Sequence, residues 1–186
     1  FYNCKSLKFM NIETSRISIG NNTFYNCSSL TSLIFSEKEK MKDFSSSNDQ
    51  PWESIRSQIK TIIIDDETTY IGSYSFYYCT SLISINIPNS VTMIGSYAFY
   101  CCISLTSLNI PNSLSSIGSY SFYNCSSLTS LIIPNNINSI ESYSFYGCSS
   151  LTSISIPNKQ ISISSDSFDY CNSVISLNIT GYGEMC

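Results

Sequence analysis

One spacing dominates this sequence: a phenylalanine recurs every 23 residues, with a single longer interval of 52. Three residues after each phenylalanine stands a cysteine, and three residues further on stands a leucine or a valine. The phenylalanines are Phe1, Phe24, Phe76, Phe99, Phe122, Phe145 and Phe168, and the cysteines are Cys4, Cys27, Cys79, Cys102, Cys125, Cys148 and Cys171. A unit this short cannot enclose its own apolar side chains, so such units stack and share one core. The spacing therefore predicts a solenoid.

Each unit contains two local patterns. The Phe-x-x-Cys-x-x-Leu segment places apolar residues at i, i+3 and i+6, which is the spacing of one face of a short helical or 3-10 segment. The following residues alternate, with Ile85 and Ile87 on one side and Ser84 and Asn86 on the other, and this alternation indicates a strand. A proline, which has no N–H for a ladder, ends the run in four units, at Pro88, Pro111, Pro134 and Pro157.

The interval of 52 residues contains an irregular unit, residues 36–58. Ile59, Ile62 and Ile64 recover the strand pattern after it, so the repeat predicts about eight short strands in one parallel sheet. Thirteen of the 22 charged residues lie between Ser36 and Glu67. This region is either a protruding loop that recognises a partner or a solvated insertion without function.

The composition excludes several kinds of catalysis. The chain has no histidine, which removes Ser-His-Asp and Cys-His nucleophiles and the usual imidazole zinc sites. Seven of the nine cysteines recur at one position of the unit, which favours a column of buried, reduced thiols over disulfides or zinc. Cys101 and Cys186 lie outside that column and are the better candidates for reaction. We expect no catalytic residue, no metal ion and no cofactor.

The outward positions of the predicted strands form the candidate binding face. They carry no charge, so this face cannot neutralise a phosphate backbone, and nucleic-acid binding is disfavoured. Small polar side chains with a few isoleucine anchors suit a protein or glycan partner. The candidate residues are Ser32, Ile34, Thr61, Ile63, Ser84, Asn86, Ser107, Asn109, Ser130, Ile132, Ser153 and Ser155.

Tyrosines recur beside the phenylalanines and form two predicted columns. One contains Tyr74, Tyr97, Tyr120 and Tyr143, and the other contains Tyr2, Tyr25, Tyr77, Tyr100, Tyr123 and Tyr146. They are either a second binding surface or side-to-side packing that seals the flank of the coil, and packing is the favoured interpretation.

The unit Ile117-Gly-Ser-Tyr-Ser-Phe-Tyr-Asn-Cys-Ser-Ser-Leu-Thr-Ser-Leu-Ile-Ile-Pro134 resembles the BspA-like leucine-rich repeats. The resemblance covers nearly the whole chain, apart from Ser36 to Gln58. It implies an α/β-type solenoid with a right-handed, curved coil, one parallel sheet, and short helical or 3-10 segments on the other side. In characterised relatives it also implies adhesion to host or matrix proteins, but it transfers no binding residue, because fold alone does not define function.

These features predict one domain, residues 1–186, that binds a protein or glycan without catalysis. We expect it to belong to a longer cell-surface or secreted adhesin, since the sequence begins inside a unit. The alternative is an intracellular, cytoplasmic scaffold or regulatory subunit, favoured by reduced cysteines. No run of roughly 18 apolar residues occurs, so we expect no direct membrane insertion by this segment.

Overall fold

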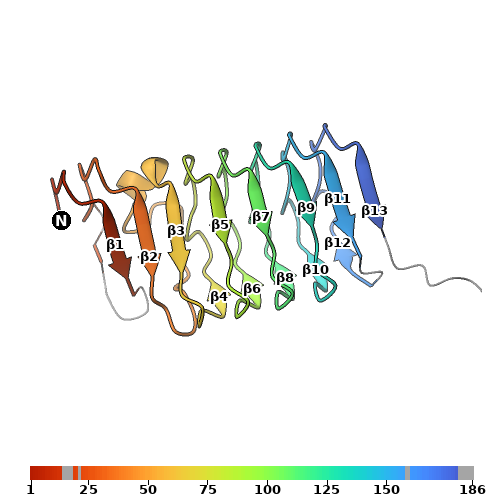
Figure 1. Cartoon of the computed structure of the whole chain (residues 1–186), viewed down its shortest axis with the longest axis horizontal. Coiled ribbons are helices and arrows are strands. Elements are labelled where there is room, and N and C mark those ends of the chain that lie inside the picture. Colours follow the sequence, from red (N-terminus) through yellow and green to blue (C-terminus); the bar gives the residue numbers. More distant parts are fainter. Residues whose placement is uncertain (14–18, 21, 158–159, 180–186) are drawn as a thin grey trace, which may run out of the picture.

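The computed structural model describes residues 1–13, 19–20, 22–157 and 160–179 and forms a solenoid. One strand of each turn lies on a common face, and these strands follow one another in chain order along the long axis (Figure 1). Their bounds are β1 Phe9–Ile12, β2 Ser32–Phe35, β3 Thr61–Ile64, β5 Ser84–Asn86, β7 Ser107–Asn109, β9 Ser130–Ile132, β11 Ser153–Ile156 and β13 Ser176–Ile179. We call their outward side chains the strand face.

These eight strands are not one continuous sheet. All paired neighbours are parallel and in the repeat's register, as in Ser84 opposite Ser107 and Ser130 opposite Ser153. The backbone ladder is nevertheless divided into β1-β2-β3, β5-β7 and β9-β11-β13. The repeat thus predicts the number, order and direction of the strands on this face, whereas the prediction that all strands form a single sheet is wrong.

A second sheet, which the sequence pattern did not predict, lines another side of the coil. Its five strands have two residues each and pair in parallel in the order β12-β10-β8-β6-β4. The isoleucines align from turn to turn, and those of the first four strands, Ile71, Ile94, Ile117 and Ile140, are buried in the core, whereas Ile163 in the last strand is exposed. The strands are β4 Tyr70–Ile71, β6 Met93–Ile94, β8 Ser116–Ile117, β10 Ser139–Ile140 and β12 Ser162–Ile163.

The Phe-x-x-Cys-x-x-Leu segments form turns, so the prediction of helical segments on this side is also wrong. Tyr97 and Cys101, which flank Phe99 at two residues on either side, have φ of 58° and 56°, and left-handed residues interrupt a right-handed helix. The N–H groups of Tyr97, Phe99 and Cys101 instead donate to carbonyl oxygens of the next turn at 3.0, 2.7 and 2.8 Å. The i, i+3, i+6 spacing arises from consecutive turns that point apolar side chains inward.

The irregular unit packs onto the solenoid. It contains the 3-10 helix η1, Glu53–Gln58, the one helix among the described residues. Met41 and Phe44 are buried and their N–H groups donate to Tyr70 and Ser73 of the next turn, both at 3.1 Å. Trp52 is fully buried, contacts Phe35 and Phe44 edge-on, and donates its indole N–H to Ser75 at 2.9 Å. Most of this segment is therefore a modified turn and not a free loop.

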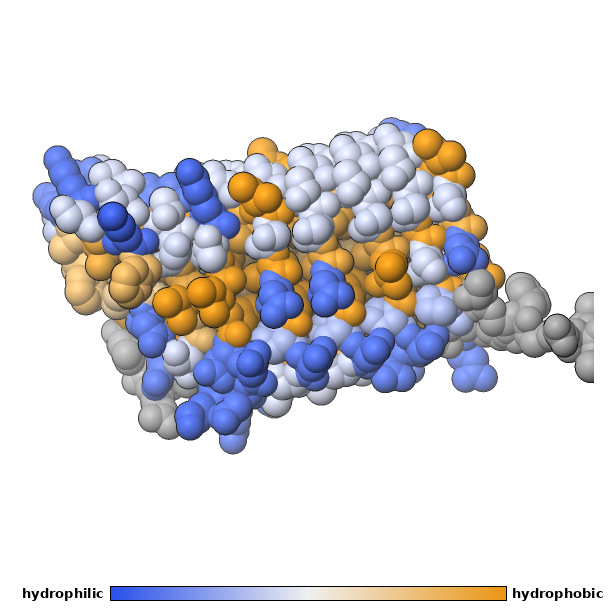
Figure 2. Space-filling view, in the orientation of Figure 1, coloured by the Kyte–Doolittle hydropathy of each residue, from blue (hydrophilic) through white to orange (hydrophobic). Residues whose placement is uncertain are grey.

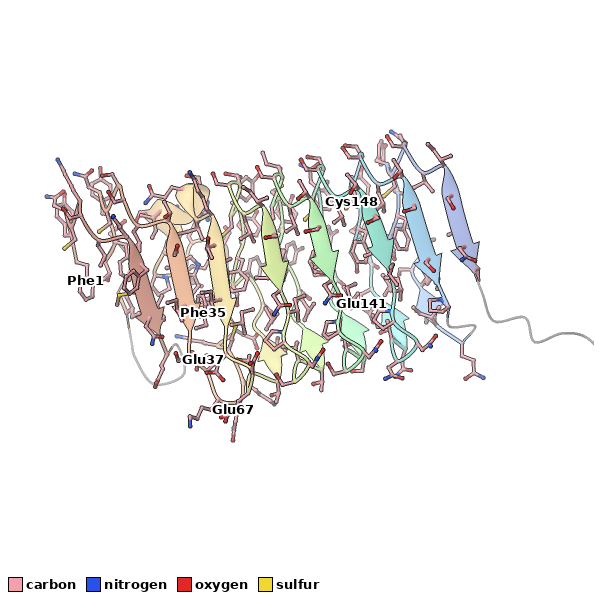
Figure 3. The ribbon with its side chains drawn as sticks, viewed as in Figure 1. Phe1, Phe35, Glu37, Glu67, Glu141 and Cys148 are labelled. Carbon is pink, nitrogen blue, oxygen red and sulfur yellow. The ribbon has the colours of Figure 1, made fainter. Side chains whose placement is uncertain are left out.

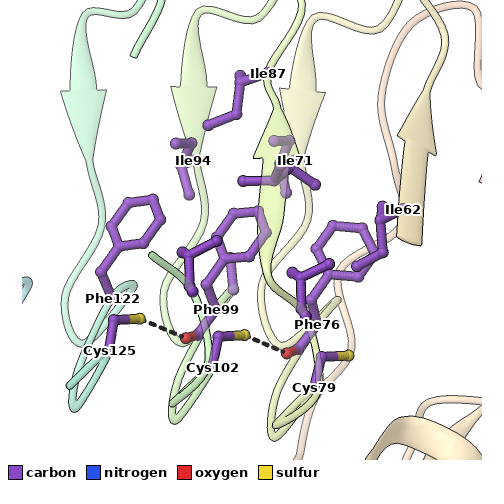
Figure 4. Close-up of a cluster of buried hydrophobic side chains, with 14 of the residues drawn as sticks. Ile62, Ile71, Phe76, Cys79, Ile87, Ile94, Phe99, Cys102, Phe122 and Cys125 are labelled. Carbon is purple, nitrogen blue, oxygen red and sulfur yellow. Dashed lines mark hydrogen bonds between the residues drawn. The ribbon is translucent and has the colours of Figure 1, made fainter. Parts of the chain in front are cut away.

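The core consists of columns that run through successive turns. Phe99 stacks on Phe122 with centroids 5.1 Å apart, and Phe122 on Phe145 at 5.2 Å. Beside them, the Cys125 thiol donates to the Phe99 carbonyl oxygen at 3.4 Å, and Cys102 donates to that of Phe76 in the same way (Figure 4). Equivalent side chains of neighbouring turns thus bury one another, as the repeat predicted.

We expect Gly95→Ala to destabilise the fold by about 1–3 kcal/mol, because a Cβ at this position overpacks the contact between turns. That Cβ would lie 2.5 Å from the Ser73 nitrogen and 2.7 Å from the Tyr70 hydroxyl. Urea unfolding measures the change. Gly20→Ala is the matched control, since its Cβ would have a nearest neighbour at 4.0 Å. Equal stability of the two variants would contradict the close approach at Gly95.

Candidate binding surface on the strand face

The predicted face residues lie where the repeat placed them. Eight of the twelve are exposed, and Ser32, Ile34, Ser153 and Ser155 are half-buried. Ile63 and Ile132 are the most prominent apolar side chains of the set, with 52% and 69% of their surface exposed. Ile34 contributes less to the surface than the sequence suggested, because it is only partly accessible.

Hydrophobic and hydrophilic groups are separated on this face. Figure 2 shows hydrophobic side chains across its middle and a hydrophilic band along its lower edge. Charged residues flank the strands: Lys60 directly precedes β3, and Glu37 and Glu67 lie at the lower ends of β2 and β3 (Figure 3). Glu67 forms a 3.9 Å ion pair with Lys38. The strand positions themselves are uncharged, so recognition there depends on hydrogen bonds and apolar contact.

A groove of about 450 Å³ opens on the strand face over β7 and β9. Four of the predicted residues line it: Ser107, Asn109, Ser130 and Ile132. The structure adds apolar residues from the core and the strand ends, and two asparagines from the same region. The groove is lined, besides those four, by Ile85, Asn89, Leu108, Ile110, Pro111, Asn112 and Pro134.

A recurring dipeptide in the sequence indicates some of the added residues. Proline followed by asparagine ends successive strands, at Pro88-Asn89 and Pro111-Asn112, and these dipeptides bring amides to the lower rim of the groove. The Asn136 side-chain amide donates to the Asn112 carbonyl oxygen at 2.6 Å and so bridges two neighbouring loops.

Asp43 forms the clearest electrostatic cluster near the irregular unit. It accepts hydrogen bonds from the Tyr70 hydroxyl at 2.6 Å and the Ser73 N–H at 2.7 Å. Partial burial opposes ionisation, but these hydrogen bonds and nearby Lys40 outweigh it, so the pKa of Asp43 is below its usual value. Every polar partner of Asp43 belongs to the neighbouring turn, which makes it a structural clamp.

The tyrosines pack in two columns on the turn side, as favoured from the sequence. From Tyr74 to Tyr146 the rings within each column stack at 4.7–4.8 Å, as in Tyr97 on Tyr120 and Tyr100 on Tyr123. Tyr2 and Tyr25 form a separate stacked pair at 5.3 Å. The two columns contact each other, with Tyr120 and Tyr123 centroids 5.7 Å apart. Burial raises the pKa of Tyr97, so its phenol stays neutral at physiological pH.

The described cysteines are free thiols. Cys79, Cys102, Cys125 and Cys148 are fully buried, and burial raises the pKa of Cys79 to about 12. The prediction that Cys101 is reactive is wrong, because it is 6% exposed and its sulfur accepts a hydrogen bond from Asn124 at 3.6 Å. Cys186 lies outside the described residues.

No group of three or more histidine, cysteine or acidic side chains in the described part of the chain is placed to hold a metal ion. No described helix has the length and apolarity needed to cross a membrane.

Parallel strands repeated every 23 residues around a phenylalanine and leucine core define a leucine-rich repeat solenoid. The family model described as "BspA type Leucine rich repeat region" matches in six copies over residues 1–50 and 49–175. The chain therefore belongs to the BspA-type leucine-rich repeat family. No curated protein sequence matches it significantly.

Solved leucine-rich repeat proteins share the fold. A leucine-rich repeat protein from Bacteroides ovatus matches 95% of this chain at 26% identity, with a TM-score of 0.68. The T. pallidum leucine-rich repeat protein TpLRR matches 92% of this chain at 22% identity, with a TM-score of 0.54, over 69% of its own length. The chain spans 50% of the length of the Bacteroides protein.

The cysteine environments predict selective labelling. At about pH 8, iodoacetamide should modify partly exposed Cys171 before Cys79 and Cys125, which should react only after unfolding, as measured by peptide mass mapping. The contact with the Cys148 thiol also lowers the pKa of Cys171, which increases its thiolate fraction. Rapid native labelling of Cys79 would contradict the buried column.

Because burial raises the pKa of Cys79, the free energy of unfolding should depend on pH in the alkaline range. The folded state keeps the Cys79 thiol neutral. The stability that this thiol contributes is therefore fully present below the ordinary thiol pKa of 9.0 and is lost as the pH rises toward the raised pKa of about 12. Urea midpoints measured between about pH 8 and 11 should fall with pH, and Cys79→Ala should reduce that slope. If the urea midpoint of Cys79→Ala falls with pH as steeply as that of the original protein, other groups cause the pH dependence.

Proposed function

We propose that this chain is a non-enzymatic binding domain that recognises a protein or glycan through its strand face. The observation that carries the proposal is the combination of an uncharged, regularly spaced polar surface with two prominent apolar anchors, Ile63 and Ile132. Such surfaces bind through a few apolar contacts surrounded by hydrogen bonds. The BspA-type repeat supports this reading, since repeats of this kind offer extended binding surfaces.

The residues offered for binding are the twelve predicted from the repeat, with the groove over β7 and β9 as their most enclosed part. The turn side is less suited to this role. The column tyrosines from Tyr74 to Tyr146 already stack on each other and are half-buried, so their ring faces are largely used within the molecule. Nucleic acid is disfavoured because the strand face has no lysine or arginine.

We place the protein at the cell surface or outside the cell, by its resemblance to BspA-type adhesins. The second candidate is a cytoplasmic scaffold or regulatory subunit, and the free thiols of the cysteine column favour it. Fractionation of cells that express the full-length gene distinguishes these two locations. A domain at the cell surface should also be accessible to protease added to intact cells, whereas a cytoplasmic domain should not.

The proposal predicts that Ile63→Lys and Ile132→Lys weaken partner binding about tenfold or more, because each replaces an apolar anchor with a solvated charge. Immobilised matrix proteins and glycans provide the partners, and surface plasmon resonance measures the affinity. Both side chains are more than half exposed, so stability should change by less than about 0.5 kcal/mol.

Ile103→Lys is the matched control, because Ile103 is 40% exposed but belongs to a turn outside the strand face. If binding to an identified partner is unaffected by both strand-face variants, the strand face is not the interface.

A further inference from the structure

The strands β7 and β9 stand apart at one point of the strand face. They are consecutive, but the ladder does not continue from one to the other. The Thr129 N–H reaches the Thr106 carbonyl oxygen at 3.5 Å, whereas the equivalent bonds on either side, from Thr106 to Ile83 and from Thr152 to Thr129, are both 2.9 Å. This bond between turns is therefore longer where the groove lies than on either side of it.

This separation exposes the core. Leu108 occupies an inward position of β7 and is half-buried, while its counterparts Ile85, Leu131 and Ile154 are 5%, 1% and 5% exposed. The other break in the ladder, between β3 and β5, has no such opening, because Ile62 and Ile85 are both 5% exposed. The groove is thus a local opening onto Leu108 and not a general property of the repeat.

The lining of the groove selects for an uncharged ligand. It contains no charged side chain, and an ion buried there would lose hydration without a partner. Leu108, Ile132 and Pro111 supply apolar contact, while Asn109 and Asn112 supply amides that both donate and accept hydrogen bonds.

We propose that this groove binds an uncharged, extended segment of a partner polypeptide, with one apolar side chain inserted against Leu108. The proposal rests on the function proposed for the strand face and names the class of its partner. Asparagine amides and serine hydroxyls match the alternating N–H and C=O groups of an extended backbone. A volume of about 450 Å³ suits one side chain with its adjoining peptide groups.

The same lining argues against a glycan in this groove. No aromatic ring is among its lining residues, so a sugar would find no aromatic face on which to stack. Its floor is a leucine side chain in contact with the core, which gains more from an apolar side chain than from hydroxyl groups.

Defined probes test the proposal without knowledge of the natural partner. The probes are capped hexapeptides in which leucine, isoleucine, valine or phenylalanine alternates with serine, a matched series with lysine or glutamate at the apolar positions, and the neutral sugars maltotetraose and chitotetraose. Methyl-labelled protein reports binding by NMR. We expect the apolar peptides, at about 1 mM, to shift the Leu108 and Ile132 methyl signals, and the charged peptides and sugars to leave them unchanged.

Two variants at equivalent positions locate the contact. Asn109 lines the groove, and Asn178, at the equivalent position of β13, does not, although both are exposed. Asn109→Asp should weaken binding of the apolar peptides about fivefold or more, because it places a charge beside their peptide carbonyls, and Asn178→Asp should leave it unchanged. Thermal unfolding of both variants checks that the fold is intact.

Several outcomes would contradict the proposal that the groove binds a peptide. These are the absence of methyl shifts with every apolar peptide, equal shifts with charged peptides or sugars, or equal effects of Asn109→Asp and Asn178→Asp. Failure of the groove is distinguishable from failure of the strand face. If Ile63→Lys weakens binding of a natural partner but the peptides do not shift the Leu108 signals, the strand face is the interface and the proposal for the groove is wrong. If the peptides shift the Leu108 signals while neither lysine variant changes the affinity for the natural partner, the proposal for the groove is supported and the proposal for the wider strand face is wrong.

Discussion

The N–H groups of Tyr97, Phe99 and Cys101 donate to carbonyl oxygens at Ser119, Ser121 and Tyr123, and the same pattern recurs from turn to turn. These bonds hold successive turns in one register on the side that lacks regular strands. Because the register is fixed, the phenylalanines of successive regular units stack on one another, as Phe99, Phe122 and Phe145 do, and their burial adds stability to a geometry that the backbone already defines. The left-handed φ values at Tyr97 and Cys101 are tolerated since hydrogen bonds and ring contacts on both sides hold them.

This division of roles leaves the strand face available for recognition. Backbone ladders and buried columns supply the contacts between turns, so the outward serine, asparagine and isoleucine side chains are not needed for them. The charged residues collect instead around the irregular unit, where Asp43 joins adjacent turns. A binding surface and a stable core are thus built from alternating positions of the same short strands.

Much of this could be predicted from the sequence. The columns through Phe122 and Cys125 and the exposure of Ile63 and Ile132 follow from a strict period, since equal spacing places equal residues in equal environments. The turn geometry could not be predicted, because i, i+3 spacing fits a helix and a pair of turns equally well. The separation of β7 from β9 also has no sequence signal: Ser107-Leu108-Asn109 differs little from Ser84-Ile85-Asn86, which pairs normally with it.

The irregular unit has a consequence for how such a chain can grow. Its extra residues are accommodated along one flank, while Leu33 and Ile62 on either side remain in register. Since each turn touches only its neighbours, inserting or duplicating a complete turn preserves every interface, and a partial insertion survives only where it can bulge sideways. The length of the molecule, and with it the reach of its surface, can therefore change by whole-unit duplication without redesign of the interior.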